Sequence, residues 1–329
     1  MSEASSTAVA IIMRTKNRSL LLDRAVRDVI GQSFQDWTLV VVNDGGDPHE
    51  VDPVIDRHRQ ELAGRVHVLT HESSKGMEAA SNAGIAASSS EFIAVHDDDD
   101  TWHPEFLQRT VEYLRSTQDA GVGVRTEIVF ERLVDGGVEE VSREIFEPGI
   151  RAISLFDTLR SNRCVPISLL YRRSVHDAVG YFDETLDVVG DWEFLLRVLQ
   201  HNSIGFIDGE PLAFWRQRRE STGDLGNSVI VADQAHHVFD RAVRERYLRS
   251  YVSETGLGGL LYLTRHQDGE IGHFHHRQTY SEGLLREILE RTKHTEERLQ
   301  ALEAAVSDAS LVSLVRRRFR RVADRLRRK

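Results

Sequence analysis

The first hundred residues alternate between short apolar runs and amphipathic helical patterns, and this alternation strongly limits the folds open to the chain. Four runs rich in apolar and β-branched residues predict strands, with helical patterns between them. Apolar strands joined by helices form βαβ units, in which helices cover both faces of a mostly parallel sheet. We therefore predict an α/β fold with strands at 8–13, 37–42, 65–70 and 92–95 and helices at 19–32 and 77–87.

The rest of the chain divides into a mixed region and a helical region. From about residue 229 onward the pattern is predominantly helical. We predict an α/β domain over 1–225, a helical extension over 226–280 and an amphipathic, basic coiled-coil helix over 281–329. Within the mixed region the predicted strands are 121–134, 166–171, 204–207 and 212–215, and the predicted helices are 154–161 and 191–200.

The formal charge of −10 averages two unlike parts. Residues 316–329 hold nine basic residues and one acid, a balance of +8, so the preceding 315 residues carry −10 − 8 = −18. An acidic body argues against nucleic-acid binding, because such binders usually carry their basic surface on the folded domain.

The expected compartment is the cytoplasm. A single cysteine, Cys164, fits a reducing environment. No basic segment precedes the short apolar run near the N-terminus, so no signal peptide is expected. No run approaches the ~18–20 apolar residues that a membrane-spanning helix needs.

Two apolar seams mark the C-terminal region. The first has the three–four spacing of a heptad repeat, with two polar positions, and predicts a weak coiled coil and hence a homo-oligomer. The second lies on a helix whose other positions carry arginines, and such a helix can bind an anionic membrane surface, here the inner face of the cell membrane. Docking on the protein's own body, binding to a partner and a solvated helix stay open as alternatives. The seams are Leu285, Ile288, Thr292, Thr295, Leu299, Leu302 and Val306, and then Leu311, Val315, Phe319, Val322 and Leu326.

Four consecutive aspartates follow the strand predicted at 92–95. Their carboxylates repel one another, and a hard divalent cation such as Mg²⁺ or Mn²⁺ offsets that repulsion while it also takes phosphate oxygens as ligands. Alternate residues of an extended segment point to opposite sides, so Asp97 and Asp99 are expected to share one side while Asp98 faces away. The alternative is a solvated acidic loop in which Asp100 caps the next helix.

Other polar residues also follow predicted strands, at the edge where sheets of this kind bind ligands. Asp44 could accept a hydrogen bond from a base or ribose, or it could simply close its loop as an Asx-turn. Arg14, Lys16 and Arg18 could pair with a phosphate or be ordinary exposed basic residues. Lys75, just before the helix predicted at 77–87, could help hold an anion at that helix's N-terminus.

Five segments, in this order, resemble those of the family 2 glycosyltransferases, which have the GT-A fold. The segments are IIMRTKNR at 11–18, VVVNDGG at 40–46, GMEAASNAG at 76–84, EFIAVHDDDD at 91–100 and VGDWEFLL at 189–196. The resemblance covers roughly residues 7–220 and implies transfer of a sugar from a nucleoside diphosphate sugar, with UDP-sugars favoured. It also implies a DxD motif, formed by Asp97 and Asp99, that holds Mn²⁺ or Mg²⁺ against the diphosphate.

The same resemblance implies roles for individual residues. Asp191, in an Asp-Trp pair that opens a helix, matches the family's catalytic aspartate, which removes the proton of the acceptor hydroxyl in an inverting displacement. The alternative is that Asp191 only caps its helix. The residues implied to contact the nucleotide sugar are Thr15, Arg18, Asp44, Lys75, Asn82, Asp97, Asp98 and Arg218.

Three positions depart from the family's pattern. Gly190 stands where an acidic residue often precedes the catalytic aspartate, and Ser81 stands where an arginine often precedes the asparagine of the third motif. Arg218 replaces the histidine of a late Arg-x-His pattern; it cannot bind a cation, but it could neutralise the diphosphate. A metal ligand could come instead from a histidine cluster of a type that more often marks a surface loop: His273, His275 and His276.

Together these features predict an inverting, hexosyltransferase-type enzyme that extends a glycan or a lipid-linked glycoconjugate on the cytoplasmic side of a membrane. Two alternatives use the same residues differently. A metal-dependent nucleotidyltransferase or phosphohydrolase would release nucleotide or sugar phosphate without an acceptor. A non-catalytic GT-A-like assembly protein would bind the nucleotide sugar without turnover, and the changes at Gly190, Ser81 and Arg218 motivate this second alternative.

Overall fold

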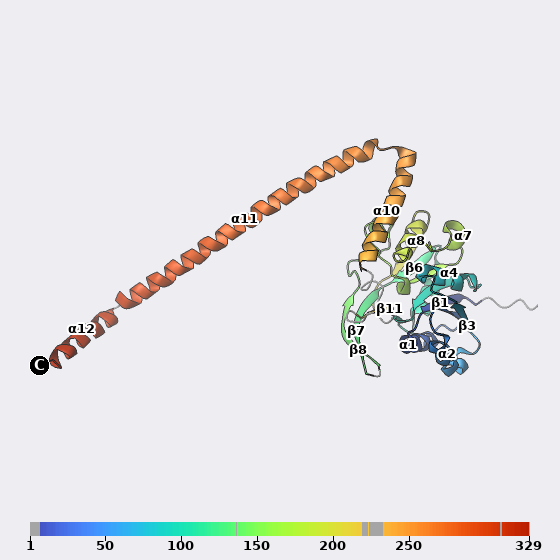
Figure 1. The fold of residues 1–329 in the computed structure, drawn as a ribbon, viewed down its shortest axis with the longest axis horizontal. Coiled ribbons are helices and arrows are strands. Elements are labelled where there is room, and N and C mark those ends of the chain that lie inside the picture. The colour runs from blue at the N-terminus through green and yellow to red at the C-terminus, as the bar shows by residue number, and fades with distance from the viewer. Residues whose placement is uncertain (1–6, 136, 219–222, 224–232, 310, 329) are drawn as a thin grey trace, which may run out of the picture. The chain divides into compact units, whose positions relative to one another are not determined.

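The structure is a computed structural model that describes residues 7–135, 137–218, 223, 233–309 and 311–328. The chain divides into two compact units, Met1–Tyr247 and Leu248–Lys329. The first unit holds two β-sheets and the helices that cover them, and the described part of the second unit contains helices and no strands. Figure 1 follows these elements along the chain by colour.

A seven-stranded sheet forms the centre of the first unit. Its strands are β1 (Val9–Thr15), β2 (Trp37–Asp44), β3 (Val66–His71), β4 (Phe92–Asp97), β6 (Gly121–Val124), β9 (Leu169–Arg172) and β10 (Ile204–Ile207). They lie in the order β10-β6-β9-β4-β1-β2-β3. The strands β1 to β4 are parallel, β9 is antiparallel to both of its neighbours, and β10 is parallel to β6. The predicted α/β fold with a mostly parallel sheet is confirmed.

Helices cover both faces of this sheet because both faces are apolar. Ile11 and Met13 of β1 lie in one buried cluster with apolar residues of α1, α2 and α5, whereas Ile12 lies in a second cluster with residues of α4 and α8. The main helices of this unit are α1 (Ser19–Ile30), α2 (Asp52–Arg57), α4 (Met77–Ala86), α5 (Phe106–Ser116) and α8 (Gly190–Leu199). The shorter ones are η1 (Pro48–Glu50), α3 (Arg59–Leu62), α6 (Leu155–Thr158), η2 (Pro166–Ser168) and α7 (Val175–Val179).

A second, four-stranded sheet has the order β5-β11-β7-β8, with β5 (Thr101–Trp102), β7 (Thr126–Val134), β8 (Gly137–Ile145) and β11 (Ala213–Gln217). The prediction of one strand over 121–134 is wrong, because β6 belongs to the first sheet and β7 to the second. At the break, the Arg125 amide donates to the Ile207 carbonyl and the Arg125 carbonyl accepts from the Leu212 amide, so the backbone changes partners there. The sequence did not predict β8, which pairs antiparallel with β7.

The carboxyl ends of β1, β2 and β4 meet at one edge of the first sheet, since these strands are parallel neighbours. Thr15 ends β1, Asp44 ends β2 and Asp97 ends β4. In the register of β1 and β4, Arg14 lies opposite Asp97. The fold therefore gathers the polar residues at the edge where ligands bind to parallel sheets.

The first unit extends further along the chain than the predicted 1–225 domain. The helix α10 (Asp233–Thr255) begins in this unit, where Phe239, Val243 and Tyr247 pack against an apolar group around Trp192. This packing ties the start of α10 to α8 and puts the end of the unit at Tyr247. The predicted boundary at 225/226 itself lies outside the described residues.

The second unit contains the end of α10, followed by α11 (Gly258–Ala309) and α12 (Leu311–Leu326). The helix α11 runs without a break through the predicted division between residues 280 and 281. Heptad positions such as Leu285, Ile288 and Leu302 are exposed. Among the described helices, none is long and apolar enough to cross a lipid bilayer.

Candidate active site

Asp97 and Asp98 contact different residues at the end of β1. Asp97 forms an ion pair with Arg14, whose Nε lies 2.9 Å from Oδ1 of Asp97. Asp98 is buried and accepts hydrogen bonds from Oγ1 of Thr15 at 2.6 Å and from Nη1 of Arg18 at 3.1 Å. Thr15 and Arg18, both predicted to contact the nucleotide, therefore lie directly beside the acidic run.

Asp98 and Asp99 do not point to opposite sides of the chain, so that prediction is wrong. The strand β4 ends at Asp97, and there the backbone turns, with the Asp100 amide donating to the Asp97 carbonyl at 3.2 Å. The alternation of side chains is a property of extended strands and does not continue through a turn. As a result, Nη1 of Arg18 lies 3.1 Å from Oδ1 of Asp98 and 3.5 Å from Oδ2 of Asp99.

Glu131, which the sequence did not predict, lies at the centre of a network of arginines next to Asp99. Its side chain is fully buried on β7, and its carboxylate lies 2.7 Å from Arg218, 2.9 Å from Arg24 and 3.1 Å from Arg216. Arg218 also pairs with Asp99. Glu131 therefore helps to hold Arg218, the residue predicted to neutralise the diphosphate, against the acidic turn. In the sequence, Glu131 is marked only as an acidic residue within a run that predicts a strand.

The crowding of carboxylates changes the acidity of the buried aspartates. Burial raises the pKa of Asp98 to about 6, because the charge of Asp99 adds to this effect and Arg18 opposes it only in part. Burial and the charges of Asp99 and Asp97 raise the pKa of Asp100 well above its ordinary value. Positive charge brought to this turn would stabilise the ionised form of these carboxylates.

Asp191 lies in the first turn of α8, next to a strained residue. Val189, just before the helix, has φ = 62°, a left-handed conformation that costs a β-branched residue about 1–3 kcal/mol. The Asp191 carboxylate accepts a hydrogen bond from Nδ2 of Asn162 at 2.6 Å. Desolvation raises the pKa of Asp191 above its ordinary value, since the opposing effects of its hydrogen bonds and of Arg14 are smaller and Asp97 adds to the rise. A raised pKa suits a general base.

Asp191 and Asp97 line the same pocket, which has a volume of about 390 Å³. Three aromatic side chains, Phe146, Trp192 and Trp215, line it as well. Ligand pockets combine such aromatic walls with a few polar groups that fix the orientation of the ligand. The pocket therefore offers apolar surface for a ring and carboxylates for its hydroxyl groups.

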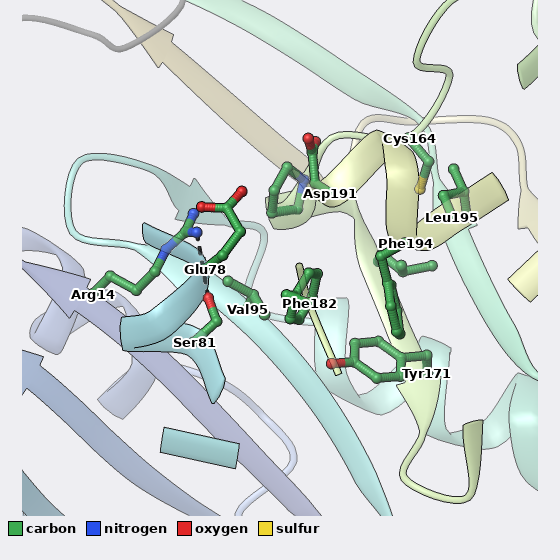
Figure 2. A pocket seen from close by; sticks show the side chains of 12 residues that line it. Arg14, Glu78, Ser81, Val95, Cys164, Tyr171, Phe182, Asp191, Phe194 and Leu195 are labelled. Atoms are coloured by element: carbon green, nitrogen blue, oxygen red, sulfur yellow. Dashed lines mark hydrogen bonds between the residues drawn. The ribbon is translucent and has the colours of Figure 1, made fainter. Parts of the chain in front are cut away.

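Glu78 is a further acidic residue of this pocket that the sequence did not predict. Figure 2 shows its side chain, from α4, with those of Arg14 from β1 and Asp191 from α8, in a smaller cavity that shares these three residues with the pocket. Burial raises the pKa of Glu78 to about 8, since the charge of Asp191 adds to this effect and Arg14 opposes it only in part. Only its position in the first turn of α4, close to the predicted Lys75, could have suggested it.

Asp44 fixes the segment that leads into α4. Its carboxylate accepts hydrogen bonds from the amides of Lys75 at 2.9 Å and Gly76 at 3.0 Å and from Oγ of Ser74 at 2.7 Å, and it lies 2.7 Å from Nδ1 of His71. Burial alone would raise the pKa of Asp44, but these hydrogen bonds, that of His71 foremost, lower it below its ordinary value. The structure thus brings Asp44 and Lys75 together, and the amides predicted to hold an anion already donate to Asp44.

Some of the predicted residues lie elsewhere. Asn82 donates to the Phe182 carbonyl at 2.9 Å and to Glu184 at 2.8 Å, and it accepts from the Phe182 amide at 3.1 Å. Asn82 therefore ties α4 to the segment 182–184, and the structure does not place it at the acidic turn. The histidine cluster lies on the helix α11, not in a loop, and its residues are exposed: His273, His275 and His276.

Asp97 and Asp99 supply the hard oxygen atoms that Mg²⁺ and Mn²⁺ prefer, but they do not complete a metal site by themselves. Over the part of the chain that the structure describes, no three His, Cys, Asp or Glu side chains converge on such a site. The side chain of Asp97 is 28% exposed and lines the pocket, whereas Asp99 pairs with Arg18 and Arg218. This donor set fits a cation whose remaining ligands come from a diphosphate, which is the usual arrangement for Mg²⁺.

A mostly parallel sheet, an acidic turn at its carboxyl edge and an aspartate that opens a helix in the same pocket are the features of a GT-A glycosyltransferase. The sequence pattern of glycosyl transferase family 2 matches residues 10–180, more than half of the 329-residue chain. The chain belongs to this family.

Proteins of known sequence and structure agree with this assignment. The uncharacterized glycosyltransferase YwdF of Bacillus subtilis is 27% identical over 256 residues, which cover 77% of this chain and 85% of YwdF. The uncharacterized glycosyltransferase alr2836 of Nostoc sp. is 31% identical over 291 residues, 85% of each chain. The crystal structure of S. aureus TarS 1–349 with UDP-GlcNAc has a TM-score of 0.53 and 18% identity, over 66% of this chain and 60% of TarS 1–349, and this likeness shows the shared fold.

Proposed function

We propose that the protein is an inverting, metal-dependent glycosyltransferase that moves a sugar from a nucleoside diphosphate sugar to a hydroxyl group of a glycan or a lipid-linked acceptor. The observation that carries this proposal is that Asp191 and Asp97 line one pocket. A base for the attacking hydroxyl and an anchor for the diphosphate are then both within reach of one bound sugar. The UDP-GlcNAc bound to TarS, which has the same fold, favours UDP as the nucleotide.

Basic residues at the acidic turn would hold the diphosphate. Arg18 contacts Asp98 and Asp99, and Arg218 pairs with Asp99, so both guanidinium groups stand where the strands end. Guanidinium groups bind phosphate oxygens through paired hydrogen bonds. Asp97 and Asp99 would hold Mn²⁺ or Mg²⁺, which when bound neutralises the negative charge of the departing diphosphate.

Asp191 would act as the general base on the acceptor. In an inverting displacement the hydroxyl attacks the anomeric carbon on the face opposite the diphosphate, and a carboxylate takes the hydroxyl proton. The hydrogen bond from Asn162 fixes the direction of the Asp191 carboxylate. The raised pKa of Asp191 means that its carboxylate binds the transferred proton more tightly than an ordinary aspartate would.

We expect a screen of nucleotide sugars to yield a donor that binds at least about tenfold more tightly in Mn²⁺ or Mg²⁺ than in EDTA. Two opposite charges 4 Å apart near a protein surface attract by about 4 kcal/mol, which is ample for this difference. Calorimetry measures the affinity, and a product assay then separates sugar transfer from release of free nucleotide.

Two results would contradict this proposal. Equal donor affinity and equal transfer in EDTA would mean that the arginines hold the diphosphate without a cation. Release of nucleotide or sugar phosphate, with no sugar on any acceptor, would favour the nucleotidyltransferase or phosphohydrolase alternative.

The second unit would bring the enzyme to other molecules. Large apolar side chains are exposed along the heptad seam of α11. The same is true of α12, where Phe319 is 72% exposed and lies among arginines. An apolar stripe on a basic helix can bind at an anionic lipid surface, and a heptad seam can pair with a second copy. We propose self-association through residues 285–306 and membrane contact through residues 311–329; the side chain of Leu311 and residue 329 lie outside the described residues.

Truncation after Tyr280 is expected to shift the mass in solution from a dimer or higher oligomer to a monomer, and to abolish sedimentation with vesicles that contain an anionic lipid. The truncation removes the seam and all of α12. Light scattering and vesicle sedimentation measure the two effects.

Point variants separate the two effects of that truncation. Ile288→Lys with Leu302→Lys places charges in the seam and should yield a monomer that still binds vesicles. Leu289→Lys changes an exposed residue beside the seam and should leave the mass unchanged. A mass that the truncation leaves unaltered would contradict the coiled coil.

A further inference from the structure

Position 190 has no room for a side chain, because the carboxyl group of Glu78 fills the space. A Cβ added to Gly190 would lie 2.6 Å from Cδ of Glu78 and closer still to its Oε1. Close-packed carbon atoms do not approach one another so nearly. Gly190 is absent from the glycines with a left-handed backbone, and all of the close atoms belong to Glu78, so a side chain at position 190 would require Glu78 to move. The absence of a side chain at Gly190 therefore leaves room for the carboxyl group of Glu78.

Glu78 is buried without a full set of partners. Its exposed fraction is 5%, and its Oε2 accepts no hydrogen bond from any residue that the structure describes. The neighbouring Arg14 directs its Nε to Asp97 and its Nη1 to Ser81 and the Met77 carbonyl. Burying a polar atom without a partner costs stability, and such atoms in native proteins often mark a functional group.

The carboxyl group of Glu78 borders the place where the reaction would occur. Glu78 and Asp191 line the same pocket, and Figure 2 shows the Glu78 side chain reaching toward the start of α8. With a pKa of about 8, Glu78 is largely protonated at neutral pH, so its O–H can donate while its other oxygen accepts. A sugar hydroxyl, which also donates and accepts, matches this group.

We propose that Glu78 hydrogen-bonds a sugar hydroxyl in this pocket and thereby holds the sugar beside Asp191. This inference rests on the proposed sugar transfer. It adds a substrate contact from α4, because the Glu78 side chain occupies the space that a side chain at residue 190 would take. A donor sugar and an acceptor glycan both offer such a hydroxyl. No bond forms or breaks at Glu78, because the acceptor proton goes to Asp191.

Glu78→Ala is expected to lower kcat/KM for sugar transfer by about 10- to 100-fold, the effect of losing one buried hydrogen bond to the substrate. The melting temperature should change little, because Oε2 of Glu78 accepts no hydrogen bond from any described residue. A rise in the donor KM would place the hydroxyl on the donor, and a rise in the acceptor KM would place it on the acceptor. Glu78→Gln should transfer sugar faster than Glu78→Ala, since the amide can also donate and accept. Glu112→Ala, an exposed glutamate of α5, is the control and should match the wild-type chain.

An exchange of positions tests the geometry. Gly190→Glu alone should lower transfer and stability, because its side chain would collide with Glu78. Combined with Glu78→Ala, the same change fills the vacated space from the other helix and brings a carboxyl group close to it. The double variant should therefore transfer sugar faster than either single variant.

Three results would overturn the inference. The first is a rate of transfer by Glu78→Ala within twofold of the wild-type rate. The second is a loss of transfer in both Glu78→Ala and Glu78→Gln that is matched by a lower melting temperature, which would make Glu78 a structural residue. The third is a double variant no faster than the single ones. A wild-type chain that transfers no sugar would instead refute the proposed function itself, and this inference with it.

Discussion

An Asp191→Asn variant is expected to transfer sugar about 10²- to 10⁴-fold more slowly than the wild-type chain, while it still binds the donor. Asparagine keeps the shape of aspartate and an oxygen for the hydrogen bond from Asn162, but it cannot take the acceptor proton. Initial rates of transfer at saturating donor measure the loss, and calorimetry checks donor binding. Asp187→Asn, which alters an exposed aspartate just before α8, is the control and should behave as the wild type.

The pH dependence of transfer gives a second test of Asp191. Only the deprotonated carboxylate can accept a proton, so transfer should be present above the pKa of Asp191 and be lost as the pH falls through it. Desolvation raises that pKa, and the acid limb should therefore lie above the value of about 3.9 that is typical of an ordinary aspartate. Unimpaired transfer by Asp191→Asn, with the acid limb intact, would remove Asp191 from the role of base.

The central sheet could be predicted because each parallel strand is a local apolar run. Residues 37–42 become β2, whose side chains are almost all buried. The strand β8 (Gly137–Ile145) has the opposite character, since it mixes charged, polar and apolar residues on a largely exposed surface. Its stability comes from pairing with β7, which a reading of local hydrophobicity does not detect.

The domain boundary was not predictable for a related reason. The apolar residues of α10 that pack on α8, such as Phe239 and Val243, have the same helical spacing as residues that remain exposed further along the chain. The sequence indicates that a helix has an apolar side, but not which surface covers it.

The acidic turn could be predicted because it follows a strand directly, and Thr15, Arg18 and Arg218 beside it were expected at the site as well, whereas Glu131 and Glu78 were not. Glu131 meets Arg24 across 107 residues of sequence and Arg218 across 87. Glu78 reaches the pocket only because α4 and α8 pack on the same face of the sheet. Such contacts depend on the tertiary fold, so the sequence motifs pointed to Asp97 and Asp191 but not to Glu131 or Glu78.

The largest expected effect on stability comes from Glu131→Ala, which should lower the free energy of unfolding by about 3–5 kcal/mol. Three guanidinium groups converge on this one carboxylate, and the side chain of Arg218 is as fully buried as that of Glu131. Without Glu131 these guanidinium groups would lose a buried counter-charge that they share, while Arg216 would still pair with Glu140 and Arg218 with Asp99. Removing one partner of a buried ion pair costs far more than the pair contributes, because the remaining charge has lost its hydration.

Urea unfolding followed by circular dichroism measures this loss, and Glu139→Ala is its control. Glu139 pairs with Arg132 in the same hairpin, but both side chains are more than half exposed, so its loss should change stability by less than about 0.5 kcal/mol. Glu131→Gln, which keeps the size and an acceptor oxygen, should lie between the two variants. If Glu131→Ala were as stable as the control, the arginines would not depend on Glu131 for their position at the acidic turn.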